Sequence, residues 1–418
     1  MTTKCSITVV FASLLLFFNS GMLEAQDDSG NYYSISGIIR DARTRRAVEY
    51  VNVSAKGTNV GTITNGDGEF VLKIAESLSV SEIELSCLGY INAKIPVSKN
   101  MAPNQLFYIT PQTVSLSEVE VIGWRYPRDL VELALSKVDK NYSTKPNLLT
   151  GFYRETVQKR RNYIHISEAI IQIYKTSYMI SVDGDRVQVL KGRKLASPKV
   201  SDTLDVKFLG GPNMPIFLDI VKNPDILLDR EYLQYYSFRM GEATTINDRL
   251  QYVVHFQPQV TLEYPLLNGT LYIDRETYSF TRAEFKMDMS NRAKVTDAIL
   301  KSKPTGLRFT PDEVAYVVTY KHLNGKTYLN YIRNEIRFRC DWRRRLFATN
   351  YTIINETVIT DNEEENAARI ATRDAFSMRK SLSQEVAAYY DEDFWGAYNI
   401  IEPTESLENA VNRLIRRQ

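Results

Sequence analysis

Cysteine is scarce in this 418-residue sequence, which contains only three. Cys5 precedes the apolar N-terminal stretch, whereas lipoprotein processing requires a cysteine directly after it, so we expect no lipid anchor. Cys87 and Cys340 stand among alternating apolar residues, as buried thiols do. Two cysteines do not form a disulfide framework in a protein of this size. We therefore expect two buried thiols.

Histidine is equally scarce, and His165, His255 and His322 are widely separated along the chain. We interpret each as a satisfied histidine on a strand rather than as a catalytic group. Known patterns for hydrolase nucleophiles, zinc helices, phosphate loops and clustered metal ligands are absent from the sequence. We therefore expect a protein that is not an enzyme, with no catalytic residue, no metal and no cofactor.

The sequence also lacks an excess of charge and, after its first residues, a long apolar run. It has 52 Lys and Arg against 50 Asp and Glu, a formal net charge of +2. A nucleic-acid-binding protein would normally carry a strongly basic face. Beyond the N-terminus no segment approaches the roughly 20 apolar residues of a membrane span. We expect neither nucleic-acid binding nor a transmembrane span.

The N-terminus has the features of a secretory signal peptide. Lys4 precedes an apolar stretch from Ile7 to Phe18, which Asn19 interrupts, and Ala25 offers a small residue at the exit. The stretch is too short and too poorly flanked to span a membrane. We expect residues 1–25 to be removed and the chain from Gln26 to be exported.

Residues 34–111 show about seven short strands separated by turns, and no helix. Val51–Ala55 and Ile83–Cys87 alternate apolar and polar residues as strands do. The Asn65-Gly66-Asp67-Gly68 stretch supplies the positive φ angles of a tight hairpin turn. This organisation predicts a small β-sandwich.

The string SGIIRDARTRRAVEYVNVSAKGTNVGTITNGDGEFVLKI, followed by IELSCLGY, resembles the carboxypeptidase-regulatory-like domain, a transthyretin-like sandwich. In metallocarboxypeptidases this module is an accessory fold without zinc ligands, so the resemblance implies no peptidase activity. The same module heads many TonB-dependent outer-membrane receptors of Gram-negative bacteria, and residues 117–123 resemble the TonB-contacting segment of such receptors. Residues 127–418 are nevertheless too few for a plug and a 22-stranded barrel. The resemblance therefore implies an envelope protein of another kind.

A linker over residues 112–126 separates this module from a second domain over residues 127–418. Pro127 and an apolar stripe predict a helix over about 127–141. Long alternating strands follow, among them Thr281–Met289 and two strands joined at Asn324-Gly325 as a two-residue hairpin. We expect one large curved antiparallel sheet with flanking helices, among them residues 364–390 with an acidic first turn at 361–365, and a last helix capped by Thr404. The fold class is α+β.

Six arginines form a candidate patch for an anionic partner. They share the polar face of one strand or follow it closely, and a solvated face is the favoured interpretation of the same pattern. The arginines are Arg333, Arg337, Arg339, Arg343, Arg344 and Arg345.

These observations predict a non-enzymatic binding or scaffolding protein of the periplasm or the periplasmic face of the outer membrane. Its sandwich would contact an envelope protein partner, and its curved sheet would hold a lipid or other hydrophobic ligand. The alternative is a periplasmic hydrolase of glycans or peptides with paired carboxylates, which requires two acidic side chains at one pocket.

Overall fold

The computed structural model describes residues 31–112, 126–199, 202, 207–208, 211–342, 347–378, 380–390 and 395–416. The expected signal peptide (residues 1–25), residues 113–125 of the expected linker with the segment 117–123, and Arg343, Arg344 and Arg345 lie outside these residues. Within the described residues, no helix is both long and apolar enough to cross a membrane.

The N-terminal part is the expected seven-stranded sandwich. Apolar and polar residues alternate in its strands, so that Ile35 and Ile39 of one strand and Phe70 and Leu72 of another are buried between two sheets. One sheet has the order β4-β1-β7 and the other β3-β2-β5-β6. The strands are β1 (Tyr32–Asp41), β2 (Asn52–Ala55), β3 (Gly61–Ile63), β4 (Glu69–Ala75), β5 (Glu82–Ser86), β6 (Ala93–Pro96) and β7 (Gln105–Ile109).

The turn at residues 65–68 does not close a hairpin as the sequence suggested. The amide of Gly68 donates to the carbonyl of Asn65 over 3.0 Å, and Gly68 has a φ of 77°. However, β3 and β4 belong to different sheets, so this turn carries the chain from one layer of the sandwich to the other. The expectation of a turn is confirmed, and the pairing of its flanking strands was wrong.

The second part is built on one 11-stranded sheet, all of whose paired strands run antiparallel. Its order is β10-β9-β8-β20-β19-β18-β16-β15-β14-β12, with β13 also paired to β14. The strands are β8 (Asn147–Lys159), β9 (Asn162–Lys175), β10 (Arg186–Ala196), β12 (Tyr236–Met240), β13 (Thr244–Ile246), β14 (Arg249–Pro258), β15 (Leu267–Asp274), β16 (Phe280–Met287), β18 (Leu307–Leu323), β19 (Lys326–Trp342) and β20 (Thr349–Glu363). A separate pair is formed by β11 (Lys207–Phe208) and β17 (Leu300–Ser302).

Two sequence patterns determine the local shape of this sheet. Asn324 and Gly325 have φ angles of 51° and 79°, as the predicted two-residue hairpin between β18 and β19 requires. In β16 Ala283 and Phe285 are buried while Lys286 is exposed, as the one-sided alternation predicts.

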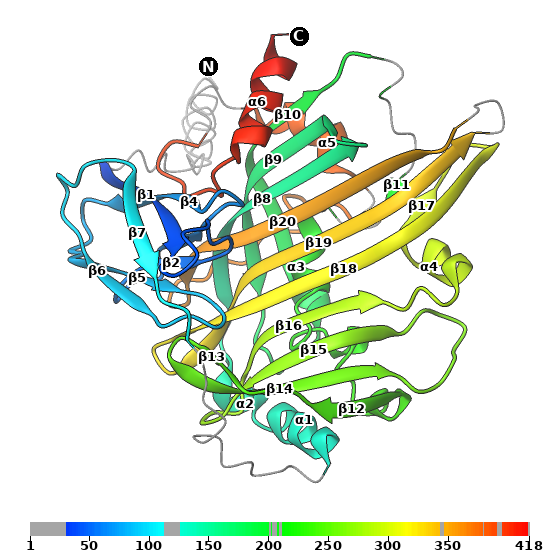
Figure 1. Ribbon diagram of the computed structural model, residues 1–418, viewed down its shortest axis with the longest axis horizontal. Helices are drawn as coiled ribbons and strands as arrows, with labels where there is room; N and C mark the ends of the chain where they lie inside the picture. The colour runs from blue at the N-terminus through cyan, green and yellow to red at the C-terminus, as the bar shows by residue number, and fades with distance from the viewer. Residues whose placement is uncertain are drawn as a thin grey trace, which may run out of the picture.

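The two faces of the large sheet contact different layers. Tyr331 and Ile332 are neighbours in β19 and therefore point to opposite faces. The ring of Tyr331 stacks on Tyr50 of the sandwich with centroids 5.5 Å apart, whereas Ile332 shares a core cluster with Leu130 from a helix. We call the face with Tyr331 the outer face and the face with Ile332 the inner face. Figure 1 shows the sandwich beside the long strands and α3 (Met214–Phe217) behind them.

Helices cover parts of both faces and differ in places from expectation. The first predicted helix is present but interrupted, as α1 (Pro127–Leu135) and α2 (Val138–Asn141). α4 (Arg292–Ile299) covers the far end of the inner face with Val295 and Ile299. The last helix is α6 (Glu405–Ile415), and the side chain of Thr404 caps it by accepting from the amide of Leu407, as predicted.

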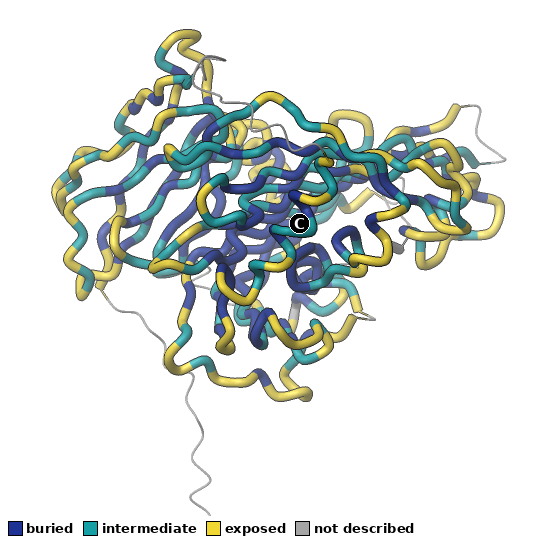
Figure 2. The backbone as a smooth tube through the Cα atoms, turned by 90° about the horizontal axis from the view of Figure 1, so that it is seen from below, coloured by how far each residue is buried: buried dark blue, intermediate teal, exposed yellow. Residues whose placement is uncertain are grey.

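The helix expected over residues 364–390 was largely wrong. The acidic run at its start belongs to β20, where Asp361, Asn362 and Glu363 pair with β8. A helical turn begins only at α5 (Leu382–Glu385). Pairing with β8 outweighs the favourable placement of acidic residues at a helix start. Figure 2 shows that the buried residues gather in the centre of the molecule and the exposed residues lie towards its ends.

Candidate functional site

A cavity of about 220 Å³ lies on the inner face of the large sheet. Its floor consists of sheet residues, and the segment 214–235, which we call the cover, closes it from above. Among the described residues that line it, Asp225 is the only one with an acidic or basic side chain. The lining residues are Leu218, Asp225, Ile226, Leu227, Tyr232, Tyr236, Tyr264, Pro265, Leu266, Leu267, Phe285, Met287 and Tyr316.

The position of the cavity follows from a break in the apolar packing of the inner face. One core cluster forms around α1 and the cover, and includes Leu267 and Phe285. A second cluster forms under α4, around Phe309 and Phe338. Met287 and Tyr316 touch both clusters and line the cavity between them. The layer that packs against the sheet is therefore not continuous.

Aromatic side chains surround the mouth of the cavity. Tyr232 and Tyr264 are 36% and 49% exposed although both line the cavity. Tyr232 also stacks on Tyr235 with ring centroids 5.8 Å apart. Large aromatic groups with a polar tip suit an opening that is apolar inside and wet outside.

Four buried charged side chains fasten the cover to the sheet. We call Lys175, Asp185, Asp219 and Lys222 the charge cluster; their side chains are at most 2% exposed. Asp219 belongs to the cover, and its carboxylate lies 2.8 Å from Nζ of Lys175 at the end of β9. Burial opposes the charge of Lys175, but Asp219 and Asp185 outweigh it and hold the lysine pKa above its usual value.

Hydrogen bonds stabilise Asp219 and Lys222 of the charge cluster. Tyr178 and Tyr320 each donate a hydroxyl hydrogen bond to Asp219, over 2.9 and 2.8 Å. Nζ of Lys222 donates to Oγ1 of Thr176 over 2.8 Å and to the carbonyl oxygens of Ser177 and Ile180. Buried charges are tolerated when they are paired and hydrogen-bonded in this way. This cluster was not predicted from the sequence, because its members come from three separate segments: the end of β9, the residue before β10 and the cover.

The candidate arginine patch lies on the outer face, and the structure places its described members in two environments. Arg333 is partly buried against the sandwich, 5.6 Å above the ring of Tyr50, and forms ion pairs with Glu335 and Glu356. Arg337 and Arg339 are about half exposed. Arg337 pairs with Glu313 and Glu335, and Arg339 pairs with Asp312.

The three histidines lie on separate strands, as expected. His165 contacts Oγ of Ser167 at 2.7 Å, His255 contacts Oγ1 of Thr270 at 2.9 Å, and burial lowers the pKa of both. His322 lies in β18 next to the turn. Within the described chain, no three His, Cys, Asp or Glu side chains converge as a metal site would need.

The buried carboxylates are bound to basic side chains or hydroxyl groups. Glu168 accepts from Arg154 over 2.7 Å and from Arg193 over 2.5 Å. Asp185 and Asp219 belong to the charge cluster. The cavity under the cover is lined by one carboxylate, that of Asp225, whereas the hydrolase alternative requires two.

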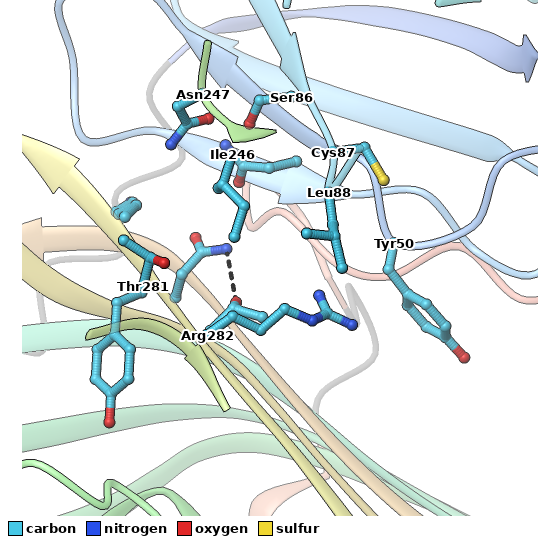
Figure 3. A pocket seen from close by; sticks show the side chains of 13 residues that line it. Tyr50, Ser86, Cys87, Leu88, Ile246, Asn247, Thr281 and Arg282 are labelled. Atoms are coloured by element: carbon cyan, nitrogen blue, oxygen red, sulfur yellow. Dashed lines mark hydrogen bonds between the residues drawn. The ribbon is translucent and has the colours of Figure 1, made fainter. Parts of the chain in front are cut away.

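A smaller cleft of about 50 Å³ lies between the sandwich and the large sheet. Figure 3 shows Ser86, Cys87 and Leu88 of the sandwich on one side of it and Thr281 and Arg282 of β16 on the other. Cys87 is a free thiol, and burial raises its pKa. This cleft lies where the sandwich and the large sheet meet, and it has room for little more than water.

Comparison with known proteins characterises the N-terminal part. Residues 35–121 match the family model of the CarboxypepD_reg-like domain. The N-terminal sandwich is a CarboxypepD_reg-like domain. A curated relative is the TonB-dependent receptor SusC of Bacteroides thetaiotaomicron, 32% identical over 111 residues. The match covers 27% of this chain and a tenth (10%) of the receptor.

Solved structures overlap with this chain only at low scores. A protein described as an outer membrane lipoprotein-sorting protein domain from Vibrio parahaemolyticus has a TM-score of 0.30 and 11% identity, covering 59% of this chain and 96% of its own. A protein described as membrane-associated and of unknown function from Bacteroides fragilis has a TM-score of 0.15 and 12% identity, covering 79% and 98%. At such scores neither structure supports an argument about this chain.

Proposed function

We propose that this chain is a non-enzymatic binding protein of the bacterial envelope that holds a hydrophobic ligand in the cavity under the cover. The observation that carries the proposal is an apolar cavity of about 220 Å³ with an aromatic mouth. An apolar cavity of about 150 Å³ already stays dry and binds benzene. A cavity this large, left unfilled between two well-packed core clusters, lowers stability unless a ligand fills it.

The envelope location is supported from two directions. The first residues have the layout of a secretory signal peptide. The sandwich resembles a segment of a TonB-dependent receptor. In this proposal the sandwich and the outer face contact an envelope protein partner, and the inner face holds the ligand.

A series of linear alkyl compounds tests the proposal by calorimetry on the chain from Gln26 onward. Each buried methylene contributes about 0.8 kcal/mol, which is roughly a fourfold gain in affinity. We expect this gain for each added carbon until the cavity is full, and no gain beyond that length. Surface adsorption would instead give weak binding without a length limit.

A pair of variants locates the binding. Met287→Trp fills the cavity and should abolish alkyl binding. Met240→Trp is the matched control, because Met240 packs against the same core cluster outside the cavity. Equal binding by both variants would refute the proposed site.

A further inference from the structure

Five polar residues form a continuous row across the inner face of the large sheet. Tyr316 in β18 pairs with Asn334 in β19, Asn334 with Asn355 in β20, Asn355 with Glu155 in β8, and Glu155 with Ser167 in β9. Residues directly opposite each other on neighbouring strands point to the same face. We call these five residues the polar row.

The polar row meets the cavity at Tyr316. Ile332 and Ile336 lie two residues before and after Asn334 in β19. Ile332 belongs to the core cluster around the cover, and Ile336 belongs to the cluster under α4. The row therefore crosses the sheet at the boundary between these two apolar clusters, where the cavity also lies. Tyr316 lines the cavity and is the end of the row.

Two polar atoms of the row lack hydrogen-bond partners among the described residues. Oδ1 of Asn334 is buried without a hydrogen bond to any described residue. Burial raises the pKa of Tyr316, and its hydroxyl forms no hydrogen bond within the described part of the chain. Buried polar groups in native proteins are nearly always paired, so the unpaired Oδ1 of Asn334 requires an explanation.

At the hydroxyl of Tyr153, acceptors of the row outnumber donors. The hydroxyl of Tyr153 faces two acceptors, Glu155 at 3.2 Å and Oδ1 of Asn355 at 3.0 Å, but has a single proton to donate. Burial raises the pKa of Glu155, which disfavours its charged form. Tyr316, Asn334 and Asn355, the row residues nearest the cavity, carry no charge, and the basic side chain that continues the row, Lys194 of β10, stands opposite Ser167 at the far end. A bound molecule that fits the uncharged end of the row at the cavity brings a hydroxyl donor for the unpaired Oδ1 of Asn334.

We propose that the polar row binds the uncharged, hydroxyl-bearing head of a single-chain amphiphile whose alkyl tail fills the cavity. This inference rests on the proposed function and adds the chemical class of the ligand. The tail lies among Phe285, Met287 and the cover, and the head reaches Tyr316 and, on the neighbouring strand, Asn334. The cavity volume suits one chain rather than two.

Three probes with the same ten-carbon acyl chain test the ligand class on the chain from Gln26 onward. They are monodecanoylglycerol, which is neutral with hydroxyl donors, methyl decanoate, which is neutral without donors, and decanoate, which is anionic. We expect monodecanoylglycerol to bind at least tenfold more tightly than either of the others. Equal affinities of monodecanoylglycerol and methyl decanoate would overturn the inference, as would tighter binding of decanoate.

The variant Asn334→Leu separates recognition from folding. Leu has a similar size and removes the unpaired amide, so we expect an unchanged or higher melting temperature. We expect Asn334→Leu to lower the affinity for monodecanoylglycerol about tenfold and to leave the affinity for methyl decanoate unchanged. Asn350→Leu, at an exposed position of β20, is the control and should change the affinity for neither probe. A row with a purely structural role would instead lose stability in Asn334→Leu and show no change in selectivity.

The two proposals fail in different ways. If methyl decanoate binds and Met287→Trp abolishes its binding, the cavity is a ligand site even when the glycerol head adds nothing. In that case only the inference about the head is overturned. If none of the three probes binds, both proposals are overturned.

Discussion

The side-chain amide of Asn399 forms both hydrogen bonds of a β-bridge with the backbone of Lys73. The amide of Lys73 donates to Oδ1 of Asn399 over 2.7 Å, and Nδ2 of Asn399 donates to the carbonyl of Lys73 over 2.9 Å. Asn399 thereby occupies the open edge of β4, and the chain around it lies between the sandwich and the large sheet. We call residues 395–405 the strap.

Further bonds tie the strap to both domains. Oγ1 of Thr62 in the sandwich donates to the carbonyl of Ile400 over 2.8 Å, and Nη2 of Arg154 in the large sheet donates to the carbonyl of Ile401 over 2.7 Å. Ile400 and Ile401 are buried among Ile63 and Phe152. The strap therefore joins the two domains as a single packed unit and covers an edge strand that would otherwise be open to pairing.

Asn399→Ala should loosen the contact between the domains. It removes two buried hydrogen bonds at about 1 kcal/mol each, so we expect the free energy of unfolding to fall by about 1–3 kcal/mol. Hydrogen exchange should also become faster at the amide of Lys73. Asn412→Ala, at an exposed position of α6, is the control and should change the free energy by less than about 0.5 kcal/mol. Unchanged protection of Lys73 in Asn399→Ala would contradict this role of the strap.

Asp219→Asn should destabilise the chain strongly and release the cover. It leaves Lys175 without its nearest carboxylate in a buried site, which costs roughly 3–5 kcal/mol in comparable proteins. Urea unfolding measures the loss, and proteolysis within residues 214–235 reports the release. Asp183→Asn, at an exposed position, is the control and should change neither the stability in urea nor the proteolysis of the cover. Resistance of the cover to proteolysis in Asp219→Asn would show that the charge cluster does not fasten it.

His165 should make stability fall as the pH falls from about 6.5 to about 4. Burial lowers its pKa in the folded chain to about 4, so the unfolded chain binds a proton over this range before the folded chain does. The difference between the unfolded and folded pKa of His165 corresponds to about 3 kcal/mol in the free energy of unfolding. This contribution is present above pH 6.5 and is lost by pH 4. His165→Gln should flatten this part of the pH profile measured by chemical unfolding.

His255→Gln is the matched control for this profile. Burial lowers the pKa of His255 as well, but by less than that of His165, so we expect a smaller flattening. An identical pH profile for wild type and His165→Gln would contradict the assignment to His165.

Arg337 and Arg339 should contribute little to folding. Both form ion pairs at the surface, and such pairs are usually worth less than about 1 kcal/mol. We expect the double substitution Arg337→Ser and Arg339→Ser to change the free energy of unfolding by less than that. Because their carboxylate partners offset their charge, binding to vesicles with anionic lipids should also be unchanged. Loss of salt-dependent vesicle binding in this variant would instead establish the patch for an anionic partner.

The sequence predicted those features that depend on neighbours along the chain. The seven strands of the sandwich, the hairpin at Asn324-Gly325 and the cap of α6 at Thr404 follow from alternation, positive φ angles and a capping side chain. The end of β20 was missed, because a pairing partner on β8 overrides the local preference of an acidic run. Similarly, the turn after β3 was recognised, but the sheet that β4 joins was not.

The candidate site could not be predicted in the same way. The polar row takes one residue from each of five strands, and nothing in the local pattern around Asn334 or Asn355 distinguishes it from an outward-facing polar residue. The charge cluster likewise unites residues up to 47 positions apart, from Lys175 to Lys222. Strand register decides both, and register is fixed by the packing of the whole sheet. A curved sheet with a hydrophobic ligand was expected, but the location of the cavity was not.

Native mass spectrometry of the chain from Gln26 onward, purified without detergent, shows whether the cavity under the cover holds a ligand. We expect the wild-type protein to carry one bound amphiphile per chain, Met287→Trp to carry none, and Met240→Trp to carry the same molecule as the wild type. A wild-type protein without any bound molecule, or one whose bound molecule persists in Met287→Trp, would contradict a ligand in the cavity under the cover.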